Sequence, residues 1–238
     1  MDTKIMNIHT PINEFVKARP DLMPILQKLQ IDFCCGGHKT LAEACTEKKL
    51  DPNVILRELL AGKDAGRQEE KDWASVSMSE LIDHLEATHH AYLRQAEPRL
   101  SSLLQKVITA HGKNHPELND LQHLVRDFWS DMTPHLLKEE RILFSMIRQM
   151  ESPVTLEEPS SCLIMGPIRV MKHEHEAVGH LLEQMRTLTN GYIPPADGCG
   201  SYHALMDELK ALESDTHLHI HKENNILFPK ALESAQSA

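Results

Sequence analysis

Apolar positions recur with helical spacing along most of the chain, and Gly, Pro and polar runs separate the periodic segments. The longest periodic segments lie beyond residue 76. They span about 77–109, 116–150, 168–188 and 202–232. Three breaks, each containing Pro or Gly, separate them. Four long helices with three breaks predict an all-α, up-down four-helix bundle.

Local sequence signals set the predicted helix ends. Ser77 and Glu80 are spaced for a capping box, and Pro116 lies near the first position of the second helix. Pro134 directly precedes His135, so a kink or an interruption is expected there. We expect residues 151–167 to form a long loop before the third helix.

The first sixty residues predict a small helical unit. Two short amphipathic stretches, INEFVKARP and DLMPILQKL, precede a helix start at Thr40 with Glu43 three residues later and another at Asp51-Pro52. The stretch AGKDAGRQEEKD at 61–72 is polar and lacks apolar periodicity. The predicted organisation is therefore an N-terminal domain at 1–61, a linker at 62–76 and the bundle at 77–238.

Composition narrows the function classes. A formal net charge of −10 disfavours nucleic-acid or anionic-membrane partners, because both are bound by clustered Lys and Arg. The chain shows no long apolar run and no signal-peptide core, so a cytoplasmic location is expected. Five cysteines, two of them adjacent, argue against a disulfide framework. The 16 histidines exceed the combined Trp, Tyr and Phe and point to metal binding.

One ten-residue pattern occurs twice, as HLLKEERILF at 135–144 and as HIHKENNILF at 219–228. Each copy places a His four residues before a Glu, so the two side chains share one helix face. The same face continues through Leu143 and Leu227, which directs it inward. A buried imidazole and carboxylate need a partner, and a metal ion supplies one.

A dinuclear site needs further ligands from the first and third helices, where His84 and His175 are the best candidates on an apolar face. Four imidazoles and two bridging carboxylates suit iron, and also manganese or zinc. The predicted metal ligands are His84, His135, Glu139, His175, His219 and Glu223. The remaining histidines are interpreted as outer-face, surface or supporting groups, including His173, His217, His221, His89, His90, His111, His115, His123, His180 and His203.

The motif Asp32-Phe-Cys-Cys-Gly-Gly-His38 is a second chemical signal. Cys34 and Cys35 precede a predicted helix start, where a thiolate is favoured and could hold iron or undergo redox exchange. The alternative is that both thiols pack as small apolar groups in a tight turn. Cys45, Cys162 and Cys199 are isolated and expected to be inert.

These motifs resemble the family of proteins for the repair of iron centres (RIC), also called ScdA-type di-iron proteins. DFCCGGHKTL is similar to the family's N-terminal domain, and HLLKEERILF, MGPIRVMKHEHEA and HIHKENNILFPKA to its hemerythrin-like domain. The resemblance implies a non-haem di-iron centre with an oxo or hydroxo bridge, on the same six ligands. It also implies a stress-response role in restoring iron-sulfur clusters damaged by nitric oxide or oxidants.

Three functions follow as hypotheses. The first is donation of iron from a labile site to damaged iron-sulfur proteins, with Cys34 and Cys35 assisting transfer. The second is an enzyme that reduces NO to N2O, and the third is a hemerythrin-like protein that binds or senses O2 or NO. The expected partners are damaged iron-sulfur proteins and the small ligands NO or O2, and a homodimer is a further candidate.

Overall fold

The computed structural model describes residues 6–34, 36–61, 72–151 and 161–237. One compact unit comprises the residues up to Ser75 together with Ile220–Ile226, and the other comprises Val76–His219 together with Leu227–Ala238. Over the described ranges the regular structure is helical, apart from one isolated β-bridge between Pro11 and Thr40. The predicted all-α class is confirmed.

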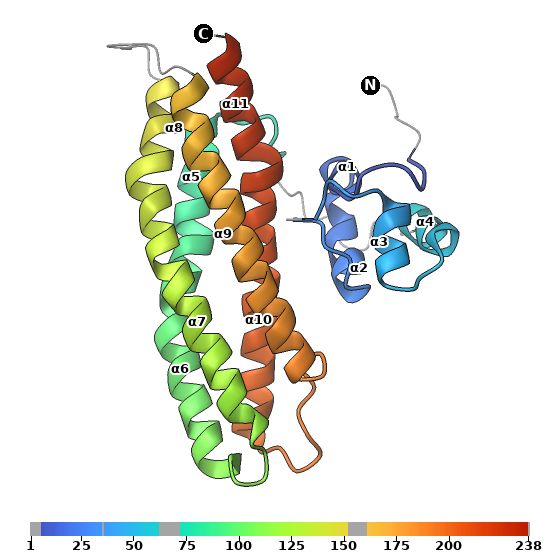
Figure 1. Ribbon diagram of the computed structural model, residues 1–238, viewed down its shortest axis with the longest axis vertical. Coiled ribbons are helices and arrows are strands. Elements are labelled where there is room, and N and C mark those ends of the chain that lie inside the picture. Colours follow the sequence, from blue (N-terminus) through green and yellow to red (C-terminus); the bar gives the residue numbers. More distant parts are fainter. Residues whose placement is uncertain (1–5, 35, 62–71, 152–160, 238) are drawn as a thin grey trace. The chain divides into compact units, whose positions relative to one another are not determined.

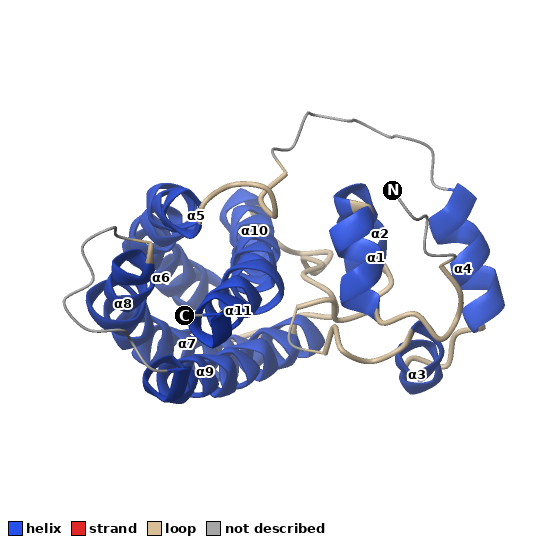
Figure 2. Cartoon of the chain, turned by 90° about the horizontal axis from the view of Figure 1, so that it is seen from above, coloured by secondary structure: helices blue, strands red, loops and turns tan. Residues whose placement is uncertain are grey.

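Four helical rods form the bundle, and Figure 1 shows them running side by side. Figure 2, which looks along the rods, shows them grouped around one common interior. The elements in chain order are α5 (Met78–Leu85), η2 (Glu86–His90) and α6 (Ala91–His111); α7 (Glu117–Lys138), η3 (Glu139–Leu143) and α8 (Phe144–Met150); α9 (Ser161–Leu188); and α10 (Gly200–Lys222), η4 (Glu223–Leu227) and α11 (Phe228–Ser237). Three of the four rods therefore consist of two α-helices joined by a five-residue π-helical turn.

The interior of the bundle is apolar above and below a polar layer. Fully buried Leu, Ile and Phe side chains of all four rods fill it, and Phe144 and Phe228 have no exposed surface. These two phenylalanines end the Ile-Leu-Phe runs of the two repeat copies. The described residues include no helix long and apolar enough to cross a membrane.

Two details of the rods differ from prediction. α9 begins at Ser161, not near Ile168, because Ile164, Ile168 and Met171 continue one buried stripe across Pro167. α7 runs without a break through Pro134, and the irregularity comes five residues later, at the π turn that starts at Glu139. The predicted interruption at Pro134 is therefore wrong.

Short helices make up the N-terminal part of the first unit. They are α1 (Ile12–Ala18), η1 (Pro20–Leu22), α2 (Met23–Lys28), α3 (Leu41–Glu47) and α4 (Pro52–Ala61). The expected capping box is present at α3, where the Thr40 hydroxyl accepts from the Glu43 amide and the Glu43 carboxylate accepts from the Thr40 amide at 2.8 Å. Most of the predicted linker, residues 62–71, lies outside the described part, and the boundaries 1–61, 62–76 and 77–238 stay a prediction.

Loss of this cap should weaken the small unit selectively. We expect Thr40→Ala to lower the free energy of unfolding of the N-terminal helices by about 1 kcal/mol, because the Glu43 amide at the start of α3 loses its acceptor. Hydrogen exchange of the amides in α3 measures the effect. Thr46→Ala, which removes a hydroxyl from the other end of α3, is the matched control. Equal exchange in the Thr40 variant and the parent protein would contradict the role of the cap.

Candidate metal centre

Both copies of the repeated sequence pattern have the same local structure. In each copy the His ends an α-helix and the Glu begins a π turn, Glu139–Leu143 in the first copy and Glu223–Leu227 in the second. A third π turn, Glu86–His90, lies in the first rod. π turns are rare and concentrate at functional sites. The two copies therefore share a local structure as well as a sequence pattern.

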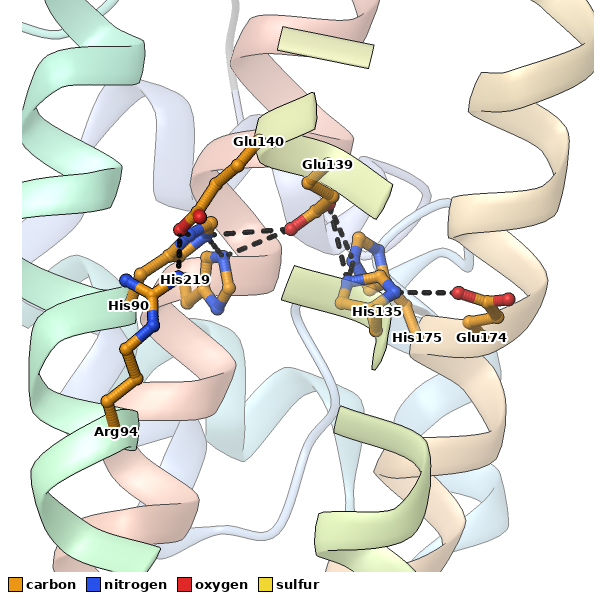
Figure 3. A network of polar contacts seen from close by, with 8 residues as sticks. All are labelled: His90, Arg94, His135, Glu139, Glu140, Glu174, His175 and His219. Atoms are coloured by element: carbon orange, nitrogen blue, oxygen red, sulfur yellow. Dashed lines mark hydrogen bonds and ion pairs between the residues drawn. The ribbon is translucent and has the colours of Figure 1, made fainter. Parts of the chain in front are cut away.

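Four imidazoles and two carboxylates meet in the polar layer of the bundle. His90 and His219 form one pair, and His135 and His175 form the other, with the two facing Nε2 atoms 3.1 Å apart in each pair. Figure 3 shows Glu139 between the two pairs. Donor atoms of His90, Glu139, His219 and Glu223 lie within 4.8 Å of one another, and so do those of His135, Glu139, His175 and Glu223. Both groups share the two glutamates.

Phenylalanines of the repeats pack against this layer. The ring of Phe144 stacks on His90 at 5.6 Å between centroids, and that of Phe228 stacks on His175 at 6.0 Å. The Ile-Leu-Phe run of each repeat copy thus supplies one wall of the site. Since ligand imidazoles must keep one orientation, a stacked ring on each side limits their rotation.

The structure brings five of the six predicted ligands together, and it places His90 where His84 was expected. His84 is only half-buried and its ring lies 5.7 Å from that of His89, outside both donor groups. In a regular α-helix, His90 would point about 140° away from buried Leu85. The π turn Glu86–His90 closes with one additional residue, which rotates His90 back towards the interior.

Two other histidines are buried, although His221 was predicted on the outer face and His89 as a surface or supporting group. His89 is 4% exposed, and its Nδ1 lies 2.9 Å from a carboxylate oxygen of Asp215. His221 is also 4% exposed, because the ring of Phe33 packs edge-on against it. Burial lowers the pKa of His221 to about 4, so this imidazole is neutral at physiological pH.

Glu139 is fully buried and lies close to imidazoles of both pairs. Its carboxylate oxygens lie 3.3 Å from His135 Nε2, 3.5 Å from His90 Nε2 and 3.8 Å from His175 Nε2. Burial alone would raise the pKa of Glu139, but the charge of His135 and the close approach of the other imidazoles outweigh it and hold the pKa well below its ordinary value. The side chain is therefore a carboxylate at neutral pH.

The donor set fits a bound metal. Both Glu139 oxygens are buried without a hydrogen-bond partner among the described residues, and the imidazole nitrogens that face them lie beyond ordinary hydrogen-bond range. A buried carboxylate surrounded by imidazole nitrogens is stabilised when a cation is shared among them. Two nitrogen and two oxygen donors in each group suit iron, manganese or zinc.

In each histidine pair, the orientation of one imidazole is held by a carboxylate that does not belong to the two donor groups. Glu140 accepts from His90 Nδ1 at 2.7 Å, and Glu174 accepts from His135 Nδ1 at 2.8 Å. Each of these carboxylates is in turn bound by a cation, Arg94 for Glu140 and Lys138 for Glu174, and Figure 3 shows the contacts of Glu140 and Glu174 with their histidines. A carboxylate on Nδ1 orients Nε2 towards a metal.

The same two opposing effects set the pKa of Glu140 and that of Glu174. Burial alone would raise the pKa of each carboxyl group, and the hydrogen bonds from its cation and its histidine lower it below the ordinary value. Both groups are therefore ionised at neutral pH and accept the Nδ1 proton. This leaves Nε2 of His90 and His135 free of a proton and able to bind a metal.

We expect Glu174→Gln to weaken metal binding about 10- to 100-fold, because an amide is a poorer acceptor for His135 Nδ1 than a carboxylate. Metal titration of the apo protein measures the change. Glu176→Gln is the matched control, since Glu176 lies on the same helix with an exposed side chain. If both variants bind metal equally well, the orienting role of Glu174 is wrong.

Asp32 organises the turn that carries the vicinal cysteines. Its carboxylate accepts from the Cys34 amide, from the Cys34 thiol and from the Gly36 amide, at 2.8, 3.1 and 2.8 Å. A side chain on Gly37 would meet the Phe33 carbonyl oxygen at 2.6 Å, so the turn requires glycine there. Cys34 is buried, and the next helix begins at Leu41 with Thr40 as its cap, where the sequence predicted a helix start. Cys35 lies outside the described residues.

Comparisons with known proteins agree with this arrangement. Residues 80–231 match the hemerythrin HHE cation binding domain, and residues 8–63 match ScdA_N, described as a domain of unknown function. The iron-sulfur cluster repair protein YtfE of Escherichia coli O157:H7 is 37% identical over 223 residues, which cover 93% of this chain and 96% of the relative. YtfE of Escherichia fergusonii is 36% identical over the same shares. The chain thus belongs to the hemerythrin HHE family, in the two-domain form that it shares with the YtfE proteins.

Proposed function

We propose that this chain is a di-iron protein that repairs iron-sulfur clusters damaged by nitrosative or oxidative stress, by donating iron from a labile carboxylate-bridged centre. The observation that carries the proposal is the pair of buried donor groups that share Glu139 and Glu223. The name of the relatives reported above, iron-sulfur cluster repair protein, supplies the reaction class.

The proposed ligands divide evenly between two ions. His90 and His219 would hold one iron and His135 and His175 the other, with Glu139 and Glu223 common to both. When bound, iron supplies one-electron redox chemistry and is also the cargo to be transferred. His84, the sixth ligand expected from the sequence, is replaced by His90 in this proposal.

Several features of the chain support release of the cargo. Each ion would have only two nitrogen donors, and both carboxylates would be divided between two ions. Since imidazoles bind metal only when deprotonated, any proton that reaches Nε2 competes directly with the ion. Lys138 and Arg94 are 39% and 49% exposed, so solvent can reach the ion pairs that keep Glu174 and Glu140 ionised.

We propose that the turn carrying Cys34 and Cys35 accepts iron when iron leaves the metal centre. Within the first compact unit, the Phe33 carbonyl oxygen accepts from the side-chain amide of Asn225 at 3.4 Å, two residues after Glu223. Cys34 follows Phe33 directly. We propose that Cys34 and Cys35 take up iron as thiolates on its way to a client protein, a step that requires the Cys34 thiol to lose its proton to solvent or to Asp32.

A repair assay tests the proposal. Iron-loaded protein is mixed with a nitrosylated iron-sulfur enzyme in the presence of a ferrous chelator too large to enter a buried site. We expect recovery of client activity with the loaded protein and none with the same amount of free ferrous iron and thiol. The double variant Cys34→Ser and Cys35→Ser should keep its iron and lose most of the repair rate. If loaded protein restores no more activity than free iron does, the proposal fails.

A further inference from the structure

A second cluster of metal-binding side chains lies at one end of the bundle. His111 ends α6, His115 lies in the turn before α7, and Asp197 and Cys199 precede α10. We call these four residues the loop-end cluster. The 21 residues of α6 separate it from His90 by about 30 Å. None of the four takes part in the proposed di-iron centre.

Three of the four residues already bring their donor atoms together, and Cys199 lies outside this group of three. Donor atoms of His111, His115 and Asp197 lie within 4.8 Å of one another. His115 Nε2 lies 3.0 and 3.2 Å from the two carboxylate oxygens of Asp197. The rings of His111 and His115 both pack edge-on against buried Tyr202, at 5.5 and 5.6 Å between centroids. An apolar floor thus fixes both imidazoles.

A carboxylate orients one imidazole here, as in the core centre. Glu117 accepts from His115 Nδ1 at 2.9 Å, which directs Nε2 of the same ring towards Asp197. A carboxylate on the far nitrogen of a histidine is the usual supporting contact of a metal ligand. Glu140 and Glu174 make the same contact with His90 and His135.

Cys199 adds a thiol donor that the sequence alone suggested was inert. Hydrogen bonding by His111, with support from the backbone amides of Tyr202 and Ser201, lowers the pKa of the Cys199 thiol to about 7. The thiol is exposed, whereas burial raises the pKa of Cys45. A lowered pKa favours the thiolate, which is the form that binds metal.

We propose that His111, His115, Asp197 and Cys199 form a second metal site, specific for a divalent cation of the zinc class. Two imidazoles, one carboxylate and one thiolate match the tetrahedral nitrogen, oxygen and sulfur coordination of zinc. Bound zinc would join the α6–α7 turn to the start of α10. With Cys199 drawn in as the fourth ligand, protein side chains would take all four positions, which gives the zinc a structural role.

The alternative for the same residues is an ion pair in which protonated His115 bridges Glu117 and Asp197. Hydrogen bonding of His115 to the Glu117 carboxylate raises the pKa of His115, with a smaller contribution from the Asp197 carboxylate, and this favours the protonated form without metal. The two states differ in His111 and Cys199, which the ion pair does not need. A test must therefore detect the thiol as well as the metal.

The probes are zinc and cobalt, added to full-length protein whose core centre is already filled with iron. We expect one additional equivalent of zinc per chain by calorimetry. Cobalt at the same site should give a thiolate-to-cobalt charge-transfer band that zinc abolishes. Zinc should also protect Cys199 from alkylation. Absence of an additional equivalent, or alkylation at an unchanged rate with zinc present, would overturn the proposal.

Variants locate the bound ion. Asp197→Asn and His115→Ala should each weaken zinc binding at least tenfold, and Glu117→Gln about 10- to 100-fold. Cys199→Ser should remove the charge-transfer band. The control is His180→Ala, which removes an imidazole that is 76% exposed on α9. Asp197 and Cys199 are exposed, so their variants keep the test valid if His115→Ala fails to fold. Unchanged zinc affinity in Asp197→Asn and an unchanged cobalt band in Cys199→Ser would each contradict the site.

Discussion

Glu139→Gln is expected to remove most of the metal from the bundle while the helices stay folded. Glu139 is fully buried among the imidazoles of His90, His135 and His175, and it belongs to both donor groups. Gln has the same shape but no charge, so two cations would lose a shared carboxylate in a buried site. We expect affinity to fall by more than the roughly 100-fold limit for loss of an outer carboxylate.

Iron content after reconstitution and desalting measures this effect, and circular dichroism checks the fold. Glu176→Gln provides the control, because it makes the same chemical change at a side chain that is 63% exposed. Retention of two tightly bound ions in Glu139→Gln would show that this carboxylate does not bridge them.

His90→Ala and His84→Ala are expected to differ sharply, although the two residues are six positions apart in one rod. His90 Nε2 lies 3.1 Å from His219 Nε2 in the polar layer, whereas His84 belongs to neither donor group. We expect His90→Ala to lose the ion held with His219 and to retain at most one iron per chain. His84→Ala should bind as much iron as the parent protein.

These two variants also distinguish the ligand set seen in the structure from the ligand set expected from the sequence. Iron analysis of both variants, with His173→Ala as an exposed control at 85% side-chain exposure, separates the outcomes. Full loading of His90→Ala together with partial loading of His84→Ala would restore the ligand expected from the sequence.

The repeated pattern predicted the centre because its information is local. In each copy, a His and a Glu four residues apart share a helix face, and the copies fall in alternate rods. The sequence therefore placed His135, Glu139, His219 and Glu223 together without knowledge of the packing. The capping box at Thr40 and Glu43 was predictable for the same reason, since it depends on three consecutive peptide units.

The remaining features of the site could not be predicted, because they depend on the rotational phase of a helix or on contacts between residues far apart in the sequence. His90 was not identified because regular α-helical spacing directs it outward, and a π turn leaves no clear mark on the sequence. Burial of His221 depends on Phe33, which is far away in the sequence. Cys199 was not identified because its pKa depends on His111, which is likewise remote in sequence. The adjacent doublet His89-His90 was the available signal, and only the three-dimensional structure separates the two roles.

Mössbauer spectroscopy of full-length protein reconstituted with isotopically enriched iron tests the central claim most directly. The proposed ligand set, His90, His135, Glu139, His175, His219 and Glu223, predicts two irons per chain that are magnetically coupled through shared carboxylates. It also predicts that His90→Ala loses the coupled signal while His84→Ala keeps it. A single uncoupled iron per chain, or a coupled signal that survives in His90→Ala, would contradict the claim.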